Sequence, residues 1–124
     1  MSDERFRPRP RDPHAADLDR WPAVRDGLLD LLAECSMIVD RGRSEFDEAR
    51  SLTYRAAEAV VIYFDDLLGR LPDDRLAVLP ADLSLAAVRR TRNILSHDDR
   101  RARKEIVWDV VEHRIPAVIL AVVG

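Results

Sequence analysis

The chain has one cysteine, four glycines and few aromatic residues. Cys35 has no second cysteine to pair with, so a disulfide framework is excluded and a reducing compartment is favoured. Glycine-rich phosphate-binding loops are missing as well. No apolar run approaches the ~18 residues of a membrane span, and residues 1–13 are too polar and proline-rich for a secretory signal. These absences predict a soluble protein of the cytoplasm.

Patterns of metal ligands are also missing. The three histidines, His14, His97 and His113, have no cysteine or carboxylate neighbours at the spacing of a metal site. Cys35 has no paired histidine that would make it a nucleophile. We therefore expect no metal and no cofactor, and we expect His113 to be an ordinary solvent-facing residue.

A length of 124 residues with 47% hydrophobic composition predicts one domain that can bury a core without metal or disulfide support. The net charge of −3 argues against broad, non-specific binding of nucleic acid, so any RNA contact must come from a local patch. The one candidate patch is a cluster of cations, and the neighbouring carboxylates of Asp98 and Asp99 reduce its positive charge. That patch comprises Arg89, Arg90, Arg92, Arg100, Arg101, Arg103 and Lys104.

The apolar residues follow a helical period throughout, and no hairpin dipeptide suggests a strand. Residues 1–13 are predicted to be a disordered arm because their prolines interrupt any regular structure, and residues 14–124 to be a single helical domain. The first helix is expected from near Asp17 to Gly42. Its inward stripe is Trp21, Val24, Leu28, Leu31, Leu32, Cys35 and Ile38.

Three more long helices follow, which together predict an all-α, antiparallel bundle of four to five helices. The second helix is expected from Ser44 to Gly69, and 72–80 can hold only a short helical turn. Its predicted inward residues are Phe46, Leu52, Ala56, Ala59, Val60, Tyr63, Phe64, Leu67 and Leu68. The third runs from Asp82 or Ser84 to about His97. The fourth begins near Ala102, and Pro116 should bend it.

Arg92 falls inside an apolar arc of the third helix, formed by Leu85, Val88 and Leu95. A cation in such a place needs a partner. One interpretation is an arginine whose charged end reaches solvent at the rim of the core. The other is an arginine directed into a cleft formed with a second subunit.

The segment Arg92-Asn93-Ile94-Leu95-Ser96-His97 combines a permanent cation, an amide and an imidazole, which suffices for metal-free cleavage of RNA. Arg92 could hold a phosphate, His97 could move protons, and Asn93 could orient the histidine or bind phosphate. On a regular helix His97 lies ~140° around from Arg92. The helix must therefore end or widen before His97, or the arginine must swing across.

Two carboxylates of the second helix, Glu58 and Asp66, lie on one face and could reach this cleft. They could equally be partners for Arg55 or Arg70 along their own helix. Trp21 and Trp108 are interpreted as core or interface anchors.

Three segments, in order, resemble the HepT-like ribonuclease toxins of the HEPN superfamily. Arg92-Asn93-Ile94-Leu95-x-His97 is similar to the R-N-I-L-x-H core of that branch. The segment 105–111, followed by Ile115-Pro116, resembles its closing helix, I-V-W…V…L-P. Upstream, the R-A-x-E…E…R-L-P pattern of that branch is similar to three parts of this chain, namely 54–58, Asp66 and 70–72. The resemblance covers roughly residues 15–122.

This resemblance implies a HEPN-type bundle, a homodimer, and an endoribonuclease site that contains Arg92, Asn93 and His97 of both chains. It also implies a partner, an antitoxin of the nucleotidyltransferase (MNT) type. The arginine patch, with Arg89, Arg100, Arg101 and Arg103, would bind the RNA substrate.

The chain departs from the family pattern at one position. HepT-like toxins commonly carry a tyrosine two residues after the histidine, where the antitoxin attaches adenylate, and this chain has Asp99 there. Two alternatives remain open: a non-catalytic HEPN subunit that binds a nucleotidyltransferase, and a plain helical scaffold dimer.

Overall fold

The computed structural model describes residues 13–80, 89–90, 92–96 and 99–124, and all regular structure in these ranges is helical. The α-helices are α1 (Pro13–Arg41), α2 (Arg43–Phe46), α3 (Leu52–Leu68), α4 (Asp73–Leu76), α6 (Arg100–Asp109) and α7 (Ile115–Val123). A 3₁₀ turn spans Ile94–Ser96, and a π-helical turn spans Val110–Arg114. The predicted all-α class is confirmed.

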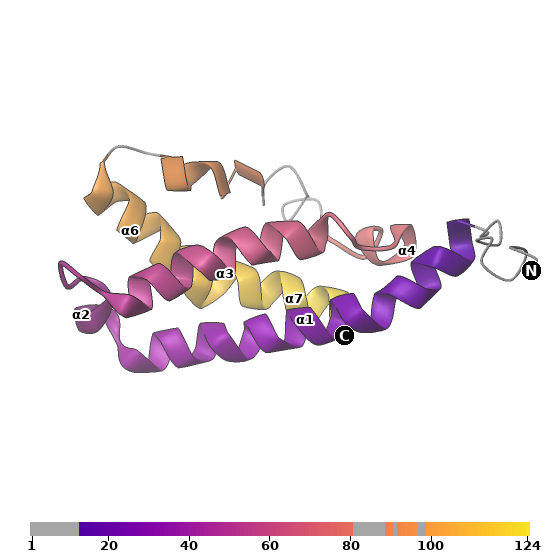
Figure 1. The fold of residues 1–124 in the computed structure, drawn as a ribbon, viewed down its shortest axis with the longest axis horizontal. Helices are drawn as coiled ribbons and strands as arrows, with labels where there is room; N and C mark the ends of the chain where they lie inside the picture. The colour runs from indigo at the N-terminus through magenta and orange to yellow at the C-terminus, as the bar shows by residue number, and fades with distance from the viewer. Residues whose placement is uncertain (1–12, 81–88, 91, 97–98) are drawn as a thin grey trace, which may run out of the picture.

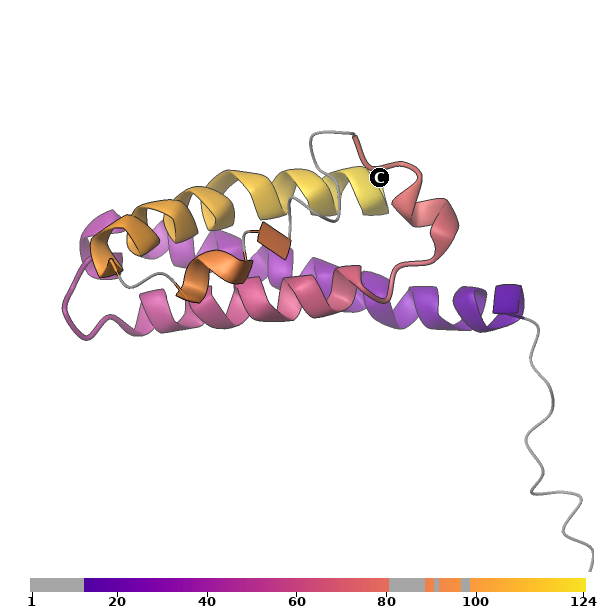
Figure 2. The same cartoon turned by 90° about the horizontal axis from the view of Figure 1, so that it is seen from above.

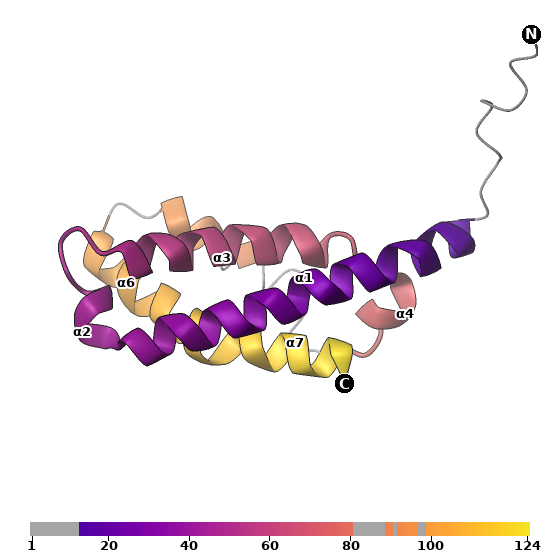
Figure 3. The same cartoon turned by 60° about the horizontal axis from the view of Figure 1, so that its bottom comes forward.

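The helices form an elongated bundle in which α1 and α3 lie antiparallel and pack against each other (Figure 1). The helix pair α6 and α7 runs along both of them, and it ends beside α1 (Figures 2 and 3). The described part of 89–96 lies on the side of α3 that faces away from α1 (Figure 1). This segment carries Arg92, so α3 forms one wall of its surroundings.

One contiguous core joins α1, α3 and the α6–α7 pair. The inward stripe predicted for the first helix is confirmed, with Trp21 and Leu32 only partly buried. At the α2 end, the fully buried ring of Phe46 packs edge-on against the rings of Tyr54 and Trp108 at 5.2 and 5.0 Å. Trp108 is thus the core anchor expected from the sequence.

The expected helix from Ser44 to Gly69 is in fact two helices, α2 and α3, separated by a turn. The break is stabilised by Ser51, whose side-chain oxygen accepts a hydrogen bond from the backbone N–H of Tyr54 at 3.0 Å. Serine before the first turn satisfies an N–H that has no partner inside the helix, and so favours a new start. The sequence interpretation missed this cap because apolar residues occur on both sides of it.

The predicted inward face of α3 was wrong in part. Leu52, Ala56, Ala59 and Tyr63 are exposed, Tyr63 by 48% and Leu52 by 79%. Three other residues of α3 are buried instead, namely Tyr54, Ala57 and Val61. Apolar residues surround most of this helix, so hydrophobicity alone does not determine which side faces the core. An apolar surface is left uncovered on α3.

Two helix starts also differ from the prediction. Helix α1 begins at Pro13, not near Asp17, because a proline at the first helical position needs no N–H partner and already has a helical φ. Helix α6 begins at Arg100, not near Ala102, because Asp99 caps it. The predicted short helix between 72 and 80 is confirmed as α4.

A π-helical turn, Val110–Arg114, lies between α6 and α7, directly before the proline that was expected to bend the fourth helix. Proline cannot donate a backbone hydrogen bond, and its ring collides with the preceding turn of a regular α-helix. A wider turn directly before Pro116 relieves this conflict. The apolar stripe continues through it, since Val110, Val111 and Ile115 are all buried.

Candidate functional site

Arg92 lies on the short helical segment that leads into the 3₁₀ turn. Its guanidinium Nη1 donates a hydrogen bond to Oδ2 of Asp65 on α3, at 3.1 Å. The Arg92 side chain is 56% exposed, whereas the Asp65 side chain is only 11% exposed. The partner that this arginine was expected to need is therefore Asp65. Of the predicted apolar arc, Leu95 is partly buried against the core, and Leu85 and Val88 lie outside the described residues.

The ion pair leaves hydrogen-bonding capacity unused on both sides. A guanidinium has five N–H donors, and one of them binds Asp65. The other carboxylate oxygen, Oδ1, is buried and accepts no hydrogen bond from the described residues. Arg92 is thus held from one side by a mostly buried carboxylate, and its other donors bind no residue of the described ranges.

Beside Arg92 there is a cleft of about 470 Å³. Its lining residues are Ala59, Ile62, Tyr63, Asp65, Asp66 and Arg92. Ile62 and Tyr63 are 47% and 48% exposed, so both present apolar surface beside these charged groups. The cleft therefore combines a charged end with an uncovered apolar wall.

The helix changes character immediately after Arg92. Ile94–Ser96 form a 3₁₀ turn, the Ser96 hydroxyl donates to the backbone carbonyl of Asn93 at 2.6 Å, and Asp99 is extended. The regular helix on which the ~140° separation was calculated therefore does not continue to position 97. His97 itself lies outside the described residues. The side chain of Asn93 is exposed.

Asp99, which occupies the position of the family tyrosine, is the N-cap of α6. Its Oδ1 accepts hydrogen bonds from the backbone N–H groups of Arg101 at 3.0 Å and Ala102 at 3.2 Å. A carboxylate here also complements the positive end of the helix dipole. In the sequence, the position of an aspartate directly before the helical run 100–107 could have identified this cap. The period of the apolar residues could not.

The four arginines predicted to bind substrate have different surroundings. Arg89, Arg100 and Arg101 are exposed. Arg103 is half-buried: it donates to the Tyr54 hydroxyl at 2.7 Å and to the Leu95 carbonyl at 3.2 Å. Arg103 thus ties the 3₁₀ turn to α6 and α3, and so supports the segment that carries Arg92.

Tyr54 feels opposing influences in this arrangement. Burial of the phenol raises its pKa, and the nearby charge of Glu58 acts in the same direction. The hydrogen bond and the positive charge of Arg103 lower the pKa, but the net shift is upward. Tyr54 therefore stays neutral and acts as the acceptor for Arg103.

The carboxylates proposed from the sequence are placed as follows. Asp66 binds Arg70, which lies just past the end of α3, at 3.0 Å, so the simpler interpretation holds for this residue. The carboxylate that binds Arg92 is its neighbour Asp65, which was missed. Asp65 is four residues after Val61 and three before Leu68, both buried, and this spacing places it at the edge of the core-facing stripe.

His113 is exposed, as expected. No group of three His, Cys, Asp or Glu side chains within the described ranges could hold a metal ion. The helices in those ranges include none that is long and apolar enough to cross a membrane. No protein-family model, curated protein or solved structure matches the chain.

Proposed function

We propose that this protein is a metal-independent endoribonuclease of the HEPN, HepT-like type, acting as the toxin of a toxin–antitoxin pair. The observation that carries the proposal is the position of Arg92. It is half-exposed, held by Asp65 at an open cleft, and located on the helical segment directly before the 3₁₀ turn Ile94–Ser96. A permanent cation held from one side is suited to bind a phosphate and offset the charge that develops on it.

Two copies of the site supply the proposed chemistry. One His97 imidazole takes the proton from the ribose 2′-hydroxyl, whose oxygen attacks the adjacent phosphorus. The second His97, as imidazolium, gives a proton to the departing 5′-oxygen, and Arg92 stabilises the pentavalent phosphorane between these steps. The products are a 2′,3′-cyclic phosphate and a 5′-hydroxyl, and no metal takes part.

The apolar wall beside Arg92 supports the homodimer that this scheme needs. Ile62 and Tyr63 expose apolar surface at the cleft that Arg92 and Asp65 line, and a second copy would cover it. Ile62→Glu should therefore give a monomer in light scattering at micromolar concentration. Leu120→Glu, at an exposed position on α7, is the matched control and should leave a dimer. A monomeric wild-type protein would refute the shared site.

Cleavage of bulk RNA by the purified protein in excess EDTA tests the function. His97→Ala should lower the rate by at least ~10²-fold through loss of proton transfer, and Arg92→Ala by a similar factor. The exposed His113→Ala is the control for a histidine change and should cleave as wild type does. Cleavage that survives His97→Ala, or that needs magnesium, would contradict the assignment.

A second candidate is a non-catalytic HEPN subunit that binds a nucleotidyltransferase antitoxin. The ion pair with Asp65 favours it, because a neutralised guanidinium attracts phosphate less strongly than a free one. Asp66 adds another carboxylate to the same cleft. This candidate would replace the first if the purified protein bound a nucleotidyltransferase stably but left RNA intact.

A further inference from the structure

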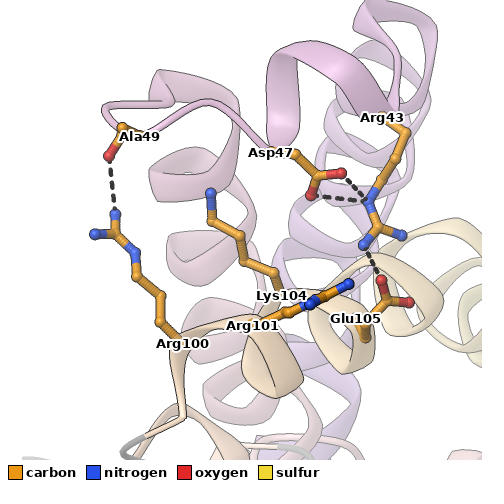
Figure 4. Close-up of a pocket in the computed structure, with 7 residues that line it drawn as sticks. All are labelled: Arg43, Asp47, Ala49, Arg100, Arg101, Lys104 and Glu105. Atoms are coloured by element: carbon orange, nitrogen blue, oxygen red, sulfur yellow. Dashed lines mark hydrogen bonds and ion pairs between the residues drawn. The ribbon is translucent and has the colours of Figure 1, made fainter.

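A second cleft, of about 490 Å³, lies between the turn that joins α2 to α3 and the start of α6 (Figure 4). Its lining residues are Arg43, Asp47, Ala49, Arg100, Arg101, Lys104 and Glu105. None of them lines the cleft beside Arg92, so the two clefts are separate surfaces.

The two carboxylates of this second cleft are already engaged by one arginine. Arg43 donates through Nε to both oxygens of Asp47 at 3.0 Å, and through Nη2 to Glu105 (Figure 4). Burial works against its charged form, but these hydrogen bonds dominate and raise the pKa of Arg43. The lining residues include four cations and two carboxylates, which leaves a net charge of +2.

The other three cations have no carboxylate partner among the described residues. Arg100 donates through Nη2 to the carbonyl oxygen of Ala49 at 3.1 Å, which is a neutral acceptor. The guanidinium of Arg101 makes no hydrogen bond or ion pair with any residue of the described ranges. Arg100, Arg101 and Lys104 all project from the first turns of α6 and line the same cleft (Figure 4).

Lys104 is the least expected residue of the three, because it is only 8% exposed. Its ammonium donates to two neutral acceptors, the carbonyl oxygens of Phe46 at 3.2 Å and Glu48 at 3.0 Å. Two of the three N–H donors of the ammonium are used in this way, and its nitrogen also lies over the Tyr54 ring, 5.1 Å from the centroid. A buried cation without a counter-charge is unfavourable, and an anion bound in the cleft would offset that cost.

The position of these cations on α6 also indicates that the cleft binds an anion. The first turn of α6 has no acidic residue and carries Arg100 and Arg101, where the helix dipole disfavours positive charge. Local sequence choices that oppose helix stability are expected at functional sites. A bound anion would be attracted by these arginines, whereas the positive end of the helix is already complemented by the Asp99 carboxylate.

We propose that this cleft binds a phosphate group of the RNA backbone. No lining residue is aromatic, so nothing in the cleft would stack on a base, and this favours a backbone phosphodiester over a free nucleotide. The inference rests on the proposed ribonuclease function. It adds a substrate contact outside the cleft that contains Arg92, which positions the strand and takes no part in the chemistry.

The test is binding of a fluorescent, uncleavable 2′-O-methyl oligoribonucleotide, measured by anisotropy over a salt series. The double variant Arg100→Ala/Arg101→Ala should bind at least ~10-fold more weakly near 0.1 M salt. Its plot of log affinity against log salt should be shallower by about 0.7, the contribution of one lost phosphate contact on a single strand. Arg25→Ala/Arg114→Ala removes two other exposed arginines and should behave as wild type.

Unchanged binding by Arg100→Ala/Arg101→Ala would overturn the proposal, and so would an equal loss in the control. Micromolar binding of ATP without binding of the oligonucleotide would also overturn it, by assigning the cleft to free phosphate ligands. The assay measures no cleavage, so the two proposals fail separately. If the protein binds the oligonucleotide but does not cleave RNA, the ribonuclease proposal is refuted and the phosphate site stands. If the protein cleaves RNA but the double variant binds normally, the phosphate site is refuted and the ribonuclease proposal stands.

Discussion

Arg92 and Asp65, 27 positions apart in the chain, are joined by a hydrogen bond of 3.1 Å between a half-exposed guanidinium and a carboxylate that is 11% exposed. The asymmetry of burial gives the two residues different roles. Asp65 is fixed in α3 and positions Arg92, and Arg92 keeps the donors that can reach a ligand.

This asymmetry predicts the result of a double-mutant cycle. Arg92→Ala leaves a mostly buried carboxylate without its cation and should lower the free energy of unfolding by about 1–2 kcal/mol, a value reduced by solvent screening at the exposed arginine. Asp65→Asn should cost less, because an amide still accepts the hydrogen bond. Denaturant titration should give a coupling of about 0.5–1 kcal/mol between them. Strictly additive effects would mean that the negative charge of Asp65 contributes nothing to its interaction with Arg92.

Capping of α6 by Asp99 predicts a second stability effect. Asp99→Ala should cost about 0.5–2 kcal/mol in urea unfolding, because the N–H groups of Arg101 and Ala102 lose their acceptor. Asp99→Asn, which can still accept these bonds, should cost clearly less. Equal losses for the two variants would show that the cap contributes through charge alone.

The same residue predicts how the protein responds to an adenylating partner. A carboxylate at position 99 would give only a labile mixed anhydride. Wild-type protein incubated with the proposed nucleotidyltransferase antitoxin and ATP should therefore gain no adenylate between Asp98 and Lys104 in intact-mass analysis. Asp99→Tyr should become modifiable, and it should lose the α6 cap as well. A stable adenylate mapped to that range of the wild-type chain would refute this expectation.

The hydrogen bond between Arg103 and Tyr54 predicts a pH dependence. Tyr54→Phe should cost about 1–3 kcal/mol at neutral pH, since a partly buried charged donor loses its acceptor. The raised pKa of Tyr54 means that folding favours the neutral phenol. Its contribution is present below the unfolded pKa of about 10 and is lost as pH rises through the folded value. Tyr63→Phe, at an exposed position, should leave this alkaline loss of stability unchanged.

Burial of Cys35 predicts an inert thiol. Burial, aided by the charge of Glu34, raises the pKa of Cys35 to about 12, and the residue is 1% exposed. The native protein should therefore react with Ellman's reagent only slowly at pH 8, and should react fully once unfolded in guanidinium. Rapid labelling of the native protein would show that α1 opens far more readily than its packing suggests.

Sequence patterns predicted the helical class and the core stripe of α1, where apolar and polar residues separate cleanly. They failed on α3, because apolar residues on both of its sides leave the orientation to tertiary packing. Arg92 was identified as a cation that needs a partner, but Asp65 could not be chosen over Asp66 without knowing that orientation. The caps Ser51 and Asp99 depend on local hydrogen bonds that hydrophobic periodicity does not report.

The central claim is that Arg92 and His97 cleave RNA by attack of the 2′-hydroxyl. The most direct test is mass spectrometry of the ends produced from a defined RNA in excess EDTA. The account predicts 2′,3′-cyclic phosphate and 5′-hydroxyl ends, no cleavage where the attacking ribose is 2′-O-methylated, and at least ~10²-fold less product with His97→Ala. Ends carrying a 5′-phosphate, or cleavage at the methylated position, would contradict it.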